Sequence, residues 1–262
     1  MSRFRNPNLR RLEHVFAGAA GGVFDLPQRV RAAVDAVDRL VAEQVRVRAL
    51  PESLADLVLV EEITAAAKAG KGRFPTADKL VVADQERRAR AAYDAALAQS
   101  LDELENQVEN AVVGCADEIV SEHLRPALAE VMVEVSEIAE LLAPYGLDHA
   151  ALLEAPEPAR KARRQLDAVA ARYTALRNAQ SALGSLREQP QIEAGKLFEI
   201  RNRTDLCAGL RAGAPWPDDT VAKLIWFADH HAEVWMPTPA ERETAALDEI
   251  EAVKAAREEV PA

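Results

Sequence analysis

The chain has 262 residues and a formal net charge of −11 at pH 7, with 49% hydrophobic and 29% charged residues. These proportions allow a buried core and exclude wholesale disorder. The acidic balance argues against nucleic-acid binding by the surface as a whole. Two cysteines are too few for a disulfide framework, so we expect reduced thiols in a cytoplasmic protein.

Residues 1–26 predict a basic flexible arm that ends in the glycine-rich run AGAAGG. The longest uncharged run in this segment is HVFAGAAGGVF, whereas a membrane span needs roughly 20 apolar residues. We therefore expect no membrane partner. The arm's basic residues are candidate contacts for a polyanion such as nucleic acid, and the alternative is a disordered leader. They are Arg3, Arg5, Arg10 and Arg11.

Residues 27–188 predict an elongated helical bundle. Good helix formers dominate, and apolar residues recur at alternating spacings of three and four, which is typical of coiled-coil seams. The phase of the longest seam slips between Cys115 and Leu128, near Gly114 and Pro126, which predicts a stutter or kink in an otherwise continuous seam. The seams are Val30 to Val41, Leu97 to Cys115, Leu128 to Leu142, and Leu166 to Leu183.

The charges of two segments predict an antiparallel coiled-coil hairpin. Residues 94–142 carry twelve acidic groups and one basic group, and residues 160–187 carry seven basic groups and one acidic group. Flanking charges of opposite sign favour such a pairing, and Gln180 in the seam would set the register. The Val30–Val41 helix is the expected third member, covering the far end of the long helix.

Residues 191–262 predict a smaller C-terminal helical lobe, whose aromatic stretch is KLIWFADHHAEVWMP. A helix over 221–235 places most of its apolar residues on a core face and leaves a second region on the other side. This second region is either buried by neighbouring helices or exposed as a patch that docks a partner. It comprises Trp226, Phe227, His230 and Val234. The sequence TPAE predicts a capping box from Thr238 to Glu241 that begins a final acidic helix.

Motifs for catalysis or metal binding are not recognisable in this sequence. Adjacent His230 and His231 point about 100° apart on a helix, so they cannot chelate one ion from one face. Glu118 and Glu122 lack the Glu-x-x-His pattern of di-iron bundles. The glycines of AGKGRFP fail the phosphate-loop spacing, and no G-x-S-x-G elbow occurs. We expect no catalytic, metal or cofactor-binding residues, and no cofactor.

Together these patterns predict an all-α, non-enzymatic protein that acts by coiled-coil association, as a scaffold, adaptor or assembly factor. In broad character, acidic and helical, it is similar to phage scaffolding proteins, which is an analogy of class rather than of motif. The expected partner is a second copy or another protein. The alternative is a nucleic-acid-associated protein that uses the basic arm or a helix-turn-helix within the C-terminal lobe.

Overall fold

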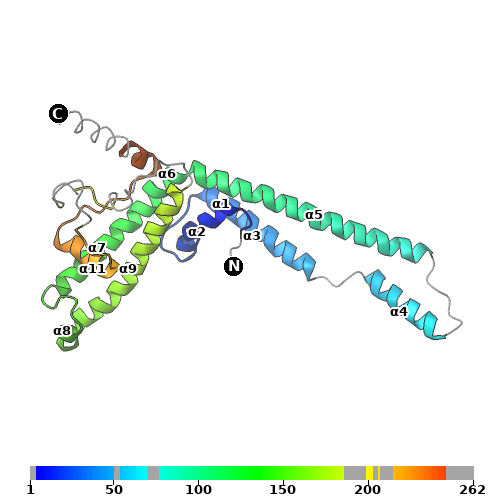
Figure 1. The fold of residues 1–262 in the computed structure, drawn as a ribbon, viewed down its shortest axis with the longest axis horizontal. Helices are drawn as coiled ribbons and strands as arrows, with labels where there is room; N and C mark the ends of the chain where they lie inside the picture. Colours follow the sequence, from blue (N-terminus) through cyan, green and yellow to red (C-terminus); the bar gives the residue numbers. More distant parts are fainter. Residues whose placement is uncertain are drawn as a thin grey trace, which may run out of the picture.

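A computed structural model describes residues 4–49, 54–69, 77–185, 199–202, 206 and 215–245 (Figure 1). Within these ranges every named element is a helix, and β pairing is limited to one antiparallel bridge between Ile200 and Val234. The predicted all-α class is therefore confirmed. None of the helices described is long and apolar enough to cross a membrane.

The helices form two limbs that diverge from a common junction (Figure 1). One limb is a long arm in which α3 lies along α5, with α4 beside α5 near the tip. The other limb contains α7, α9 and α11. In chain order the elements are α1 Pro7–Arg11, α2 Glu13–Ala20, α3 Gln28–Arg48, α4 Leu54–Ala69, α5 Ala77–Gly114, α6 Ala116–Glu118, η1 Ile119–Leu124, α7 Arg125–Leu142, α8 His149–Glu154, α9 Glu157–Gly184 and α11 Thr220–Asp229.

The predicted long helix is broken where its seam slips. Cys115 leaves the helical conformation with φ −107° and ψ 6°, and η1 follows as a π-helical turn. Pro126 lies at the start of α7, where it lacks an N–H and its ring crowds the carbonyl four residues back. The wider π-turn accommodates this defect. The break redirects the chain from the arm into the second limb, and it lies where the phase slip predicted a stutter or kink.

The helix pair α7 and α9 packs side by side in opposite directions, joined through α8 (Figure 1). Each buries the apolar seam read from the sequence, including Val135 on α7 and Leu176 on α9, which are both 0% exposed. Burying such a side chain stabilises the fold by about 1.5–3 kcal/mol. Arg172 of α9 pairs with Glu134 of α7 at 2.8 Å. Coiled-coil packing of this hairpin stays a prediction.

The N-terminal segment is part of the folded core, so the expected flexible arm is wrong for residues 4–26. Helix α2 packs against α9, and α1 contacts α5. Apolar side chains spaced three or four apart drive this docking, because they form one face of two short helices. The buried residues of the segment include Phe4, Leu9, Leu12, Val15 and Phe16. Arg3 lies outside the described residues.

The described C-terminal residues lie on the second limb. Helix α11 contacts both α7 and α9, and its Leu224 and Phe227 belong to the same buried cluster as Phe4. The predicted capping box is confirmed, since the N–H of Glu241 donates to the Thr238 hydroxyl and the Glu241 carboxylate accepts from the N–H of Thr238. The proposed start of the lobe at 191–198 and the final residues 246–262 lie outside the described ranges.

Candidate protein-interaction site

The predicted aromatic region is a cluster in which only some side chains reach solvent. Phe227 is 1% exposed and Trp216, from the preceding segment, is 5% exposed. Trp226 is half-buried and stacks on the exposed His230 ring with a centroid distance of 4.1 Å. Trp216 lies 5.8 Å from Trp226 and 5.6 Å from Phe227. Phe227 is therefore a core residue, and Trp226 with His230 forms the accessible edge.

The helix predicted over 221–235 is too long, because α11 ends at Asp229. His231 takes a positive φ of 50°, a conformation that terminates helices. The N–H of Ala232 then donates to the carbonyl of Phe227 at 2.9 Å. Val234 consequently lies in an extended segment, half-buried and bridged to Ile200, rather than on the face of Trp226.

A guanidinium on α9 anchors the extended segment that follows α11. Arg177 donates to the carbonyl oxygens of Trp235 at 2.7 Å and Glu199 at 3.2 Å. The side chain of Gln180 donates to the carbonyl of Pro237 at 3.0 Å. The sequence pattern placed Gln180 in the seam between α7 and α9. Its side chain also hydrogen-bonds the segment that follows α11, which belongs to neither helix. Sequence reasoning missed the role of Arg177, because its acceptors are backbone atoms that no side-chain pattern marks.

A pocket of about 280 Å³ opens between α7 and this extended segment. Arg125 on its wall donates to the carbonyl of Met236 and pairs with Glu241. Arg201 lies over the ring of Trp235 at 5.3 Å. The described lining residues include no serine, cysteine, histidine or carboxylate, so they supply no nucleophile or general base. They are Arg125, Leu128, Ala129, Met132, Arg201, Ala232, Val234, Trp235 and Met236.

Other candidate chemistry is equally sparse in the described part of the chain. No group of three or more His, Cys, Asp or Glu side chains there could hold a metal ion. Cys115 is 1% exposed, and burial raises the pKa of its thiol although Arg29 acts in the opposite direction. A buried thiol with a raised pKa is a poor nucleophile.

The candidate polyanion contacts do not form a projecting arm. The guanidinium of Arg5 donates to Gln44, and that of Arg10 donates to the carbonyl of Phe4. The side chain of Arg11 is exposed on α1. The backbone N–H groups of Arg5 and Asn6 donate to Glu105, which fixes the segment on α5.

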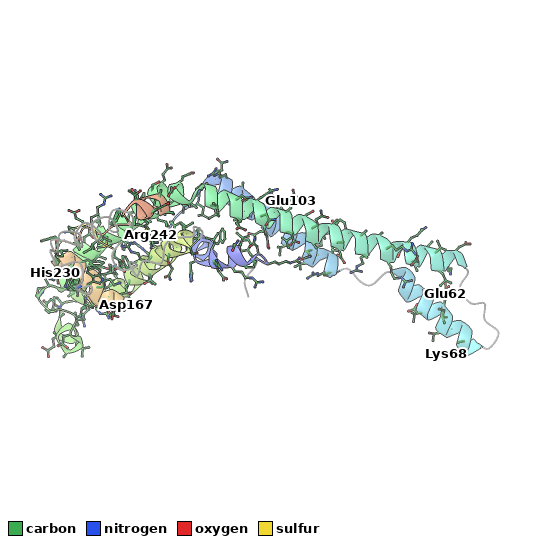
Figure 2. The ribbon with its side chains drawn as sticks, turned by 45° about the horizontal axis from the view of Figure 1, so that its top comes forward. Glu62, Lys68, Glu103, Asp167, His230 and Arg242 are labelled. Atoms are coloured by element: carbon green, nitrogen blue, oxygen red, sulfur yellow. The ribbon has the colours of Figure 1, made fainter. Side chains whose placement is uncertain are left out.

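The distal half of the arm carries the most prominent apolar surface. Eleven large hydrophobic side chains are exposed among the described residues, and seven of them lie at the end of α3, on α4 or on the first half of α5. Figure 2 shows this tip, marked by Glu62 and Lys68, far from His230 on the other limb. The seven are Val45 (62% exposed), Val60 (62%), Ile63 (42%), Leu80 (51%), Val81 (53%), Val82 (49%) and Tyr93 (46%).

Polar contacts hold the helices of the arm together beside this surface. The hydroxyl of Tyr93 donates to Glu43 at 3.0 Å, and Arg90 donates to the carbonyl of Val47 at 3.2 Å. Hydrogen bonds, first from Arg46 and then from Tyr93, lower the pKa of Glu43 to about 2. Lys79 pairs with Glu62 between α5 and α4. Because a helix pair can bury only one stripe of each member, the outer faces of the arm stay accessible.

In comparisons with known proteins, no family model, no curated protein and no solved structure matches this chain.

Proposed function

We propose that this protein is a non-enzymatic helical interaction protein, a scaffold, adaptor or assembly factor, that associates through the distal part of its arm. The observation that supports this most directly is the group of seven exposed hydrophobic side chains on α3, α4 and α5. Exposed apolar groups scattered singly are ordinary, but a group gathered on one limb is typical of a protein contact.

The proposal also rests on the shape of the arm. Helices α3 and α5 project away from the second limb (Figure 1), so a partner can reach the tip without meeting α7, α9 or α11. Covering apolar surface stabilises an association by about 25 cal/mol for each Å² removed from water. The described pocket offers no catalytic pair of side chains, so an interaction role fits the described residues better than an enzymatic one.

Sedimentation velocity over a range of protein and salt concentrations tests this function. A triple variant, Leu80→Ser, Val81→Ser and Val82→Ser, removes three of the exposed apolar side chains of the arm. Val113→Ser, Val133→Ser and Leu141→Ser form the matched control, because these residues are 41%, 60% and 47% exposed outside the distal arm. We expect reversible association of the native chain, which the arm variant loses and the control keeps. A native chain that is monomeric at every concentration would contradict the proposal.

A further inference from the structure

The first turns of α5 present one face directly away from the rest of the arm. Ala83 is 0% exposed and Leu97 is 7% exposed, which marks the inner face of the helix. At about 100° per residue, the opposite face carries the side chains that lie about 180° from Ala83. These are Val81, Gln85, Arg88 and Ala92, and all four are exposed.

The order of residues along this stretch is self-complementary. From the tip inward it runs apolar, acidic, basic and apolar, in the sequence LVVADQERRARAAY over residues 80–93. Reversing the direction of the helix exchanges the acidic part for the basic part and brings each apolar end against the other. Asp84 and Arg88 lie four residues apart and therefore on the same side of the helix. In a contact between two identical chains related by a twofold axis, every pairing of two residues occurs twice. Such a contact therefore needs a pattern that matches itself when the direction of the helix is reversed.

We propose that a second copy of this chain docks antiparallel on this face of α5, with the twofold axis near Glu86. The inference rests on the proposed function and names the partner of its arm. In this contact Val81 packs against Ala91 and Ala92 of the second copy, where small side chains allow the two helices to approach closely. Asp84 pairs with Arg88 of the second copy, and Arg88 pairs with its Asp84.

The present state of the two charged residues favours a second copy over an unrelated partner. Within one chain Arg88 pairs with Asp84 at 2.8 Å, with side chains 80% and 46% exposed. On docking, the two intrachain pairs, one in each copy, exchange for two pairs between copies, so that neither charge is buried without a counter-charge. The arm also permits the geometry, because the second limb lies at the opposite end of α5 from the tip (Figures 1 and 2). Two antiparallel chains therefore place these limbs at opposite ends of the dimer.

Charge reversal in the full-length chain tests the antiparallel pairing. In a homodimer of the Asp84→Arg variant, two arginines face each other at both pairing positions. In a homodimer of the Arg88→Asp variant, two aspartates do. We expect each single variant to weaken self-association by about tenfold, as measured by sedimentation equilibrium. We expect an equimolar mixture of the two variants to associate at least as tightly as the native chain, and the double variant D84R/R88D to recover the native affinity.

The pair Arg163 and Asp167 on α9 supplies the matched control. It is also an exposed ion pair four residues apart, at 2.6 Å, and lies outside the arm. We expect Arg163→Asp and Asp167→Arg to leave association unchanged, and circular dichroism to show native helix content in all variants.

The outcomes separate this inference from the function on which it rests. If the serine triple variant abolishes association while D84R and R88D both retain it, the arm is the interaction surface and the antiparallel contact is wrong. If the mixture associates no better than either variant alone, the assigned pairing of Asp84 with Arg88 is overturned. If the native chain does not associate at all, the proposed self-association through the arm fails as well.

Discussion

The carboxylate of Glu105 on α5 accepts a hydrogen bond from the backbone N–H of Asn6 at 2.8 Å, across 99 positions of the sequence. The second oxygen of Glu105 accepts from the N–H of Arg5 at 2.9 Å. Glu105 is 1% exposed, so these two N–H groups satisfy a carboxylate that has little access to water. This contact attaches the N-terminal segment to α5. The two helices that follow it, α1 and α2, then pack against α5 and α9 and cover the core.

Replacing Glu105 with Gln is expected to lower the free energy of unfolding by about 1–3 kcal/mol. The amide keeps the shape of the side chain, but its NH₂ group faces a backbone N–H that needs an acceptor. Urea unfolding followed by circular dichroism measures the change. Glu103→Gln is the control, because Glu103 is exposed on the same helix. Equal stability of the two variants would show that the docking of residues 4–6 contributes nothing.

Replacing Arg177 with Ala is expected to release the segment around Trp235. The guanidinium donates to two backbone carbonyls and to Gln180, so its loss leaves acceptors without donors and costs about 2–3 kcal/mol. Limited proteolysis should then cut within residues 232–238 faster than in the native chain. Arg172→Ala on the same helix removes a half-exposed ion pair with Glu134, which is worth about 0–1 kcal/mol. Cleavage at the same rate in both variants would argue against the anchoring role of Arg177.

Substitutions in the aromatic cluster are expected to cost much more stability at the buried Phe227 than at the exposed His230. Phe227→Ala leaves a cavity under α11 and should cost about 3–5 kcal/mol of stability. His230→Ala removes a ring that stacks on Trp226 at the exposed surface, and should cost less than about 1.5 kcal/mol. Thermal unfolding of the two variants measures the difference. A His230→Ala variant as unstable as Phe227→Ala would mean that the exposed edge is needed for the packing of α11.

The stability of the protein is expected to fall in alkaline solution through Tyr173. Burial is the main cause that raises the pKa of its phenol, although Arg177 acts in the opposite direction. A group with a raised folded-state pKa contributes stability that is fully present below the unfolded-state pKa, about 10 for tyrosine. This contribution is lost as the pH rises from there through the folded-state pKa. Tyr173→Phe should therefore flatten the decline in unfolding free energy above about pH 10, measured relative to the same variant at pH 7. An unchanged decline would exclude Tyr173 as its source.

Local sequence patterns predicted much of the helical architecture. The seams of valine and leucine predicted the helices that became α3, α5, α7 and α9, because the spacing of apolar residues is a property of each helix alone. The phase slip near Gly114 and Pro126 located the break between α5 and α7, and the TPAE motif located the cap at Thr238. Each of these features depends on residues within a few turns of one another.

The prediction for the N-terminal segment was wrong because its structure depends on residues far away in the sequence. Its four arginines and its glycines suggested a mobile arm, whereas Leu9, Leu12 and Val15 are each 0% exposed. Two helices of five and eight residues are too short to be stable alone, so their formation depends on α5 and α9. The same limit applies to α11, a helix of ten residues whose end at Asp229 the apolar pattern did not predict.

The sequence alone determined the helical class, the heptad-like stripes and the point where the long helix breaks, since the backbone period and the chemistry of proline act locally. Only the tertiary structure decided the direction in which the chain turns at that break and the docking of α1 and α2 on distant helices. It also decided the backbone acceptors of Arg177 and the side chains left exposed at the tip of the arm. These depend on which apolar surfaces meet across large sequence separations, and a one-dimensional pattern does not encode that choice locally.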